Sequence, residues 1–124
     1  MRTVFAIGAG GFVGALARYG VHVVLLRVAG PTLPFATLAV NTVGSFALGL
    51  LFGIAETHAV PPAVRLGLGV GVLGAFTTFS TFAIDTLALG ARDGGPALAL
   101  GNVVLNVGLA LGAAAFGIQV ARSV

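Results

Sequence analysis

Three long stretches of this chain carry no charged side chain, and this pattern constrains its fold more than any other feature. The uncharged stretches cover residues 28–55, 66–84 and 94–121, and a fourth apolar region, residues 3–26, is interrupted only by Arg18. Charged residues make up 7% of the chain, whereas a soluble domain normally carries about 25%. A helix needs about 20 apolar residues to cross the hydrocarbon core of a bilayer. The sequence therefore predicts an all-α, multi-pass membrane protein.

Turn signals between these stretches set the expected helix ends. Proline and glycine residues at 30–34, 61–62 and 94–96 separate the apolar stretches, and proline is well suited to the first turn of a helix. We expect four transmembrane helices, near residues 3–27, 35–55, 62–90 and 97–121. Because no segment has the composition of a linker, residues 1–124 are expected to form a single integral membrane domain. The expected location is the plasma membrane of a bacterium.

The arginines give little direction to the insertion of these helices. With four spans, one side of the membrane would hold Arg2, Arg65 and Arg122, and the other side would hold Arg27 and Arg92. The positive-inside rule needs a clear bias of basic residues, which three against two does not supply. Two alternatives remain open, namely insertion in both orientations (dual topology) or a single topology set by one dominant arginine. A bundle this small has little interior for a pore, so we also expect association with a second copy.

Several function classes are disfavoured by what the sequence lacks. Cysteine is absent, and there is no carboxylate pair, histidine–carboxylate metal spacing or nucleophile–base set, so we expect no enzyme. All six basic residues are arginines and they do not cluster, so nucleic acid is not an expected partner. A small proton-coupled multidrug exporter also has four helices, but its mechanism needs a carboxylate inside the membrane. Glu56 and Asp85 lie toward helix ends.

The most unusual segment lies in the third apolar stretch, where residues 74–82 read GAFTTFSTF. Hydroxyl groups without a partner are costly in hydrocarbon, so this segment is expected to line something, which argues against a purely structural membrane subunit. Glycine, threonine and serine favour interruption of a helix, and an unwound turn frees carbonyl oxygens that can hold a cation. We therefore predict that the third helix is broken at mid-membrane.

Aromatic rings and amides supply the remaining candidate groups. Phe79 and Phe82 are three residues apart and share a helix face, and their electropositive ring edges could pass a small anion without binding it tightly. Asn41 lies in the second expected helix, and Asn102 and Asn106 share a face of the fourth. These amides either form hydrogen bonds between helices or line an anion path, and the presence of three of them favours the path.

Arg18, in the later part of the first expected helix, has two open interpretations. Its side chain could reach along the helix to the nearer membrane surface. Alternatively, it could face a water-filled vestibule and attract anions.

Three segments together resemble the signatures of the CrcB/Fluc family of fluoride channels. They are residues 10–19 (GGFVGALARY), 37–46 (TLAVNTVGSF) and 74–82 (GAFTTFSTF), and their order and spacing and the chain length also agree with the family. The resemblance implies an antiparallel, dual-topology homodimer with two fluoride pores and a central, structural sodium ion. It further implies that the protein passively exports fluoride from the cytoplasm and so lowers its toxicity.

The resemblance also implies roles for individual residues. Arg18 would be the vestibule arginine, and Gly74 and Thr77 would give backbone carbonyl oxygens to sodium. Family members often have Tyr and Ser, four residues apart, where this chain has Asn102 and Asn106. The expected fluoride-pore residues are Asn41, Phe79, Ser80, Thr81, Phe82, Asn102 and Asn106.

Overall fold

A computed structural model describes residues 1–123, and within them the chain is helical without strands. Four helical stretches are long and apolar enough to cross a membrane, with mean hydropathies of 1.5 to 1.9. The prediction of an all-α chain with four membrane-length helices is thereby confirmed. The elements are α1 (Arg2–Ala29), α2 (Phe35–Thr57), α3 (Pro62–Leu66), the π-helix η1 (Gly67–Leu73), α4 (Gly74–Phe76), α5 (Phe79–Gly90) and α6 (Gly95–Arg122).

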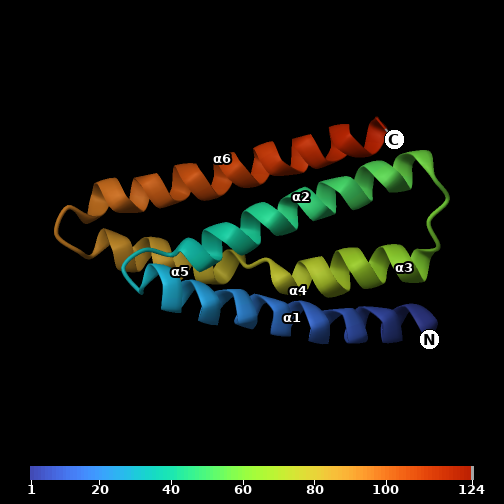
Figure 1. The fold of residues 1–124 in the computed structure, drawn as a ribbon, viewed down its shortest axis with the longest axis horizontal. Helices are drawn as coiled ribbons and strands as arrows, with labels where there is room; N and C mark the ends of the chain where they lie inside the picture. Colours follow the sequence, from blue (N-terminus) through green and yellow to red (C-terminus); the bar gives the residue numbers. More distant parts are fainter. Residues whose placement is uncertain (124) are drawn as a thin grey trace.

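The four stretches run alternately up and down, with both chain ends at the same end of the molecule (Figure 1). The most extensive packing joins α2 to α6, followed by α1 against η1. The third stretch, Pro62–Gly90, comprises α3, η1, α4 and α5 and lies beside α1 for its first half. Its second half, α5, packs mainly against α6. This arrangement brings α2, α5 and α6 together around the segment at residues 74–82.

Glycine permits close approach of the helices at two contacts. A Cβ at Gly10 would collide with the backbone of η1, and a Cβ at Gly49 would collide with the backbone of α6. Any side chain at these two positions would push the helices apart. Gly108 and Gly112 of α6 differ, because a Cβ there would meet nothing within 4 Å. This pair therefore leaves a smooth, open face on the outside of the chain.

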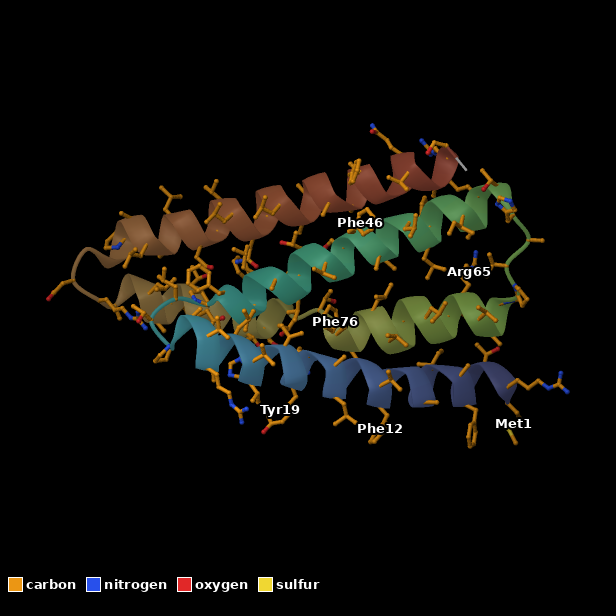
Figure 2. The ribbon with its side chains drawn as sticks, viewed as in Figure 1. Met1, Phe12, Tyr19, Phe46, Arg65 and Phe76 are labelled. Atoms are coloured by element: carbon orange, nitrogen blue, oxygen red, sulfur yellow. The ribbon has the colours of Figure 1, made fainter. Side chains whose placement is uncertain are left out.

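Burial in this chain differs from that of a soluble protein. Buried polar residues include Thr37, Asn102 and Asn106, whereas large apolar side chains such as Phe12 and Tyr19 are exposed. Figure 2 shows Phe12 and Tyr19 projecting from α1 away from the bundle. Exposed apolar side chains suit hydrocarbon, and polar side chains of membrane helices face the interior of the bundle. The buried polar groups therefore mark the part of the molecule where function is expected.

The third stretch is not one uninterrupted helix. α4 ends at Phe76, and Thr77 and Thr78 have extended backbones, with ψ angles of 160° and 118°. α5 then begins at Phe79, and Thr78 serves as its N-cap.

Candidate functional site

The extended residues between α4 and α5 redirect two backbone hydrogen bonds. In a continuous helix the N–H of Thr78 would donate to the Gly74 carbonyl, and the N–H of Thr81 to the Thr77 carbonyl. Instead, Thr78 N–H donates to Asn41 Oδ1 at 2.9 Å. Thr81 N–H donates to Thr78 Oγ1 at 3.2 Å. The carbonyl oxygens of Gly74 and Thr77, the two predicted cation ligands, have therefore lost their helical donors.

Asn41 of α2 holds this segment with both edges of its amide. Besides accepting from Thr78 N–H, it donates from Nδ2 to the Thr78 carbonyl and to Asn106 Oδ1, each at 3.1 Å. A primary amide has two N–H groups, so both are engaged. Gly44, one turn further along α2, leaves room for this approach, because a Cβ there would collide with the Thr77 side chain. Asn41 thus takes the place of the helical acceptor of Thr78 N–H and adds a donor to the Thr78 carbonyl.

One open groove of about 330 Å³ brings together four of the predicted pore residues, Asn41, Phe79, Phe82 and Asn106. The two rings lie with centroids 5.5 Å apart and planes inclined by 53°. Phe79 is 80% exposed and Phe82 is 8% exposed. The groove is formed by α2, α5 and α6, and no charged side chain lines it. It is an uncharged surface with two aromatic rings and two amides on its walls.

A second cavity contains the predicted vestibule arginine. Its polar lining includes Arg18, Tyr19, His22, Thr37, Thr78 and Thr81. Arg18 Nε is buried and has no hydrogen-bond partner within residues 1–123. Of the two interpretations of Arg18, this position agrees with the one in which it faces a cavity. Thr78 lines both this cavity and the groove, so it lies between the two.

Two predicted pore residues lie outside both cavities. Ser80 is exposed, and its Oγ is 3.5 Å from Thr78 Oγ1. Asn102 is buried and faces other side chains: it accepts from Asn106 Nδ2 at 3.0 Å and donates to Thr86 Oγ1 at 2.8 Å. The structure therefore connects Asn102 to the groove through Asn106 and, by way of Thr86, through the Phe82 carbonyl.

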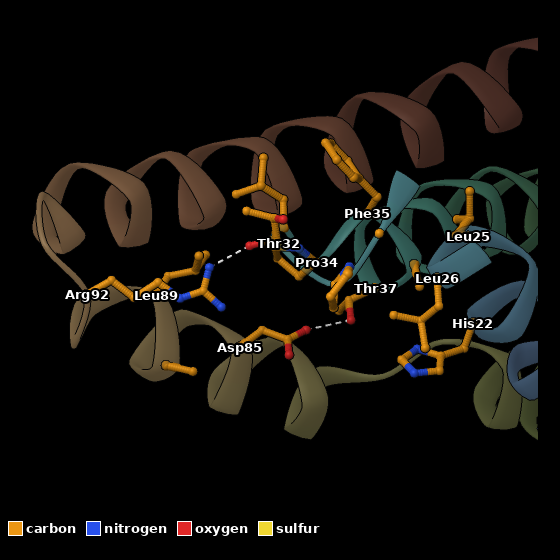
Figure 3. A pocket seen from close by; sticks show the side chains of 15 residues that line it. His22, Leu25, Leu26, Thr32, Pro34, Phe35, Thr37, Asp85, Leu89 and Arg92 are labelled. Carbon is orange, nitrogen blue, oxygen red and sulfur yellow. Dashed lines mark hydrogen bonds between the residues drawn. The ribbon is translucent and has the colours of Figure 1, made fainter. Parts of the chain in front are cut away.

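A third cavity holds polar residues that the sequence analysis did not select. Thr37 Oγ1 donates to Asp85 Oδ2 at 2.6 Å, and Arg92 donates to the Thr32 carbonyl, as the dashed lines in Figure 3 show. His22 forms part of the same wall. Thr37 lies one helical turn before Asn41, and this spacing is the sequence signal that could have identified it.

Comparison with known proteins identifies similar sequences over nearly the whole chain. A protein-family model described as "CrcB-like protein, Camphor Resistance (CrcB)" matches residues 5–118. Proteins of Shewanella halifaxensis and Shewanella piezotolerans, each named fluoride-specific ion channel FluC, are 40% identical over 111 residues. A protein of the same name from Shewanella pealeana is 41% identical over 111 residues. Each alignment covers 90% of this chain and 89% of the relative.

Proposed function

The chain belongs to the CrcB-like protein family, and we propose that it is a fluoride-specific ion channel that passively exports fluoride from the cytoplasm. It is a multi-pass integral membrane protein of a bacterial membrane, and a channel rather than an enzyme. The structural observation that carries the proposal is the uncharged groove, where Phe79 and Phe82 lie beside Asn41 and Asn106. A wall of ring edges attracts an anion through the aromatic quadrupole but lacks a fixed charge that would retain it.

Passive export is sufficient because of the acid–base chemistry of fluoride. Neutral HF enters the cell from an acidic medium and dissociates in the more alkaline cytoplasm. The inside-negative membrane potential then drives the anion outward through an open path, by about 2.3 kcal/mol per charge for each 100 mV. Selectivity against chloride comes from the width of the path and the placement of its donors.

The proposed fluoride path begins in the cavity with Arg18, whose positive charge raises the local anion concentration. From there the hydroxyl groups at the start of α5, including Thr81 and Ser80, replace part of the hydration shell of the ion. Fluoride then passes the edges of Phe79 and Phe82 in the groove. In this proposal Asn41 and Asn106 supply the polarity of the wall, and Asn102 holds Asn106 in place.

We further propose that the functional unit is an antiparallel, dual-topology homodimer with one fluoride path along each groove. The groove is open on one side, Phe79 is 80% exposed in the single chain, and the Gly108–Gly112 face of α6 has room for close contact. A second copy would close the groove and cover Phe79. Thr77 and Thr78 fall near the middle of the 29-residue stretch Pro62–Gly90, which supports an interruption at mid-membrane.

A structural sodium ion fits the chemistry of the interrupted segment. Hard cations bind oxygen ligands, and carbonyl oxygens at broken membrane helices are suitable donors. The Gly74 and Thr77 carbonyls lack their helical donors because Thr78 and Thr81 donate elsewhere. Two carbonyls from one chain do not complete a coordination shell, so both copies of the dimer would contribute. A bound cation would join the two copies and offset the negative ends of these carbonyl dipoles.

The alternative function, a proton-coupled multidrug exporter, needs a carboxylate on the substrate path. Asp85, the acidic residue within the third stretch, lines the cavity of Figure 3 and accepts from Thr37. It does not line the groove. This separation favours the fluoride channel.

Liposomes that contain only this protein test the function directly. Fluoride efflux should greatly exceed chloride efflux, and Phe79→Ile or Phe82→Ile should reduce fluoride efflux steeply, because isoleucine keeps the bulk but removes the ring quadrupole. The matched control is Phe12→Ile on α1, which replaces a similarly exposed ring outside the groove and should leave efflux unchanged. Equal efflux of both halides would refute fluoride specificity. Unchanged efflux in both folded groove variants would exclude this groove as the path.

A further inference from the structure

A continuous series of hydrogen bonds connects the interrupted segment to α5 by way of α2 and α6. Asn41 Nδ2 donates to Asn106 Oδ1, and Asn106 Nδ2 donates to Asn102 Oδ1, at 3.1 and 3.0 Å. Asn102 Nδ2 donates to Thr86 Oγ1 at 2.8 Å, and Thr86 Oγ1 donates to the Phe82 carbonyl at 2.7 Å. We call these four side chains, Asn41, Asn106, Asn102 and Thr86, the amide–hydroxyl chain.

The backbone of Thr78 sets the orientation of every amide in this chain. The Thr78 N–H needs an acceptor, and the Thr78 carbonyl needs a donor. Asn41 must therefore present Oδ1 to the N–H and Nδ2 to the carbonyl. Asn106 must then turn its oxygen toward Asn41 and its nitrogen toward Asn102. All donors along the chain therefore point the same way, an arrangement in which neighbouring hydrogen bonds strengthen one another.

Because two of its members are buried, the amide–hydroxyl chain is sensitive to the loss of any one of them. Asn106 is 4% exposed and Asn102 is 8% exposed, so little of either side chain is open to water. An unpaired polar group in such surroundings is costly, and the neighbouring side chains would shift to pair it. Loss of one member would thus disturb the others.

The amide–hydroxyl chain holds the first turn of α5 at both ends of that turn. Asn41 binds Thr78, immediately before α5, and Thr86 binds the Phe82 carbonyl one turn into it. Phe79 lies between these two points of attachment, and Phe82 is itself the second point. The ring positions in the groove therefore depend on side chains that come from three different helices.

We propose that Thr86 and Asn102 are positioning residues for fluoride conduction, acting through the amide–hydroxyl chain to fix the Phe79 and Phe82 rings. Neither residue lines the groove, so neither is expected to contact the anion there. This inference rests on the proposed function of the groove. Small displacements of groups that meet a passing ion have large effects on rate, because the favourable geometry must be in place when the ion arrives.

Single-channel recording in planar bilayers tests this role, because unitary conductance is measured only on folded, inserted channels. Thr86→Val keeps the shape of threonine but can neither donate nor accept, and it should lower the unitary fluoride conductance by roughly tenfold, which corresponds to about 1.4 kcal/mol. Thr86→Ser retains the hydroxyl and should conduct like the unsubstituted protein. A purely structural role of Thr86 would reduce the yield or thermal stability of Thr86→Val and leave its unitary conductance unchanged.

A matched control is Thr57→Val at the end of α2. Thr57 Oγ1 also donates to the carbonyl four residues earlier, that of Gly53, but it is exposed and outside the amide–hydroxyl chain. The unitary conductance of the Thr57→Val variant should equal that of the unsubstituted channel. If Thr86→Val does not fold, Thr86→Cys, a weaker hydrogen-bonding group, must conduct less than Thr86→Ser.

Two results would overturn the inference and one would overturn its premise. Positioning by Thr86 is refuted if the Thr86→Val variant has the same unitary conductance as the unsubstituted channel. Where the valine variant cannot be measured, it is refuted if Thr86→Cys and Thr86→Ser have equal unitary conductances. Absence of fluoride current from the unsubstituted protein would instead refute the proposed function itself, so the two failures are distinguishable.

Discussion

Replacing Asn41 with aspartate should both destabilise the protein and stop fluoride flux. An ionised carboxylate can still accept from Thr78 N–H but cannot donate. The two donations from Asn41 Nδ2, to the Thr78 carbonyl and to Asn106 Oδ1, would be lost. In their place a negatively charged oxygen would face two other oxygens across distances that are now 3.1 Å.

The charge should dominate the energetic effect. Hydrogen bonds between membrane helices average about 0.6 kcal/mol, so two lost bonds cost about 1 kcal/mol. A carboxylate near the centre of a membrane helix costs about 2.5–3.5 kcal/mol. The sum, about 4 kcal/mol, is a large fraction of the roughly 5–15 kcal/mol that stabilise a typical folded protein. Asn41→Ser separates the effect of charge, because its short side chain loses the three hydrogen bonds of the amide without adding charge, and it should cost about 2 kcal/mol.

Thermal unfolding of the purified variants in detergent, together with fluoride efflux from liposomes, checks this reasoning. The unfolding temperature should fall slightly for Asn41→Ser and strongly for Asn41→Asp. The deficit of the aspartate variant should shrink as the pH falls and the introduced carboxyl becomes neutral. Fluoride efflux through Asn41→Asp should be blocked, because the new charge repels the anion in the groove. Equal unfolding temperatures for Asn41→Asp and Asn41→Ser would show that the Asn41 site is more open to water than its contacts imply.

Two further predictions concern the assembly. Two reporters, each active on one side of the membrane, should both give signal when fused to the C-terminus, because the arginines are nearly balanced between the two sides. Signal from one side alone would disprove dual topology. Replacement of sodium by a large organic cation should reduce fluoride flux and dimer lifetime, because the Gly74 and Thr77 carbonyls would lose their counter-charge; unchanged values after rigorous sodium removal would contradict a central ion.

The positions of the helices could be predicted closely because charges, prolines and glycines punctuate the sequence. The ends that differ have local causes. α1 continues past the predicted end at residue 27 to Ala29, because Arg27 is compatible with a helix end and the chain turns only at Gly30, where φ is 73°. α6 begins at Gly95 rather than near residue 97, because Pro96 occupies its first turn. Arginine therefore marked the ends of spans less sharply than glycine and proline did.

The candidate site could be predicted only in part, because its contacts depend on how the helices are rotated against one another. The segment at residues 74–82 is conspicuous by composition alone, and Asn41, Asn102 and Asn106 are conspicuous as amides among apolar residues. Periodicity does not reveal that Asn41 binds the backbone of Thr78, or that Thr86 terminates the hydrogen-bonded series. A threonine within a helix is an ordinary residue until the partner helix places an amide beside it.

The Asn41 contact couples the proposed anion and cation sites through one backbone unit. Because Asn41 Oδ1 takes the N–H of Thr78, the Gly74 carbonyl loses the donor that it would have in a continuous helix. Because Asn41 Nδ2 also donates to the Thr78 carbonyl, the residue between the Arg18 cavity and the groove is held by the same amide. The side chain that frees a carbonyl for the proposed cation thus also shapes the wall of the proposed fluoride path. Cation binding and fluoride conduction should therefore respond together to substitutions at Asn41, whereas substitutions of Phe79 should affect conduction alone.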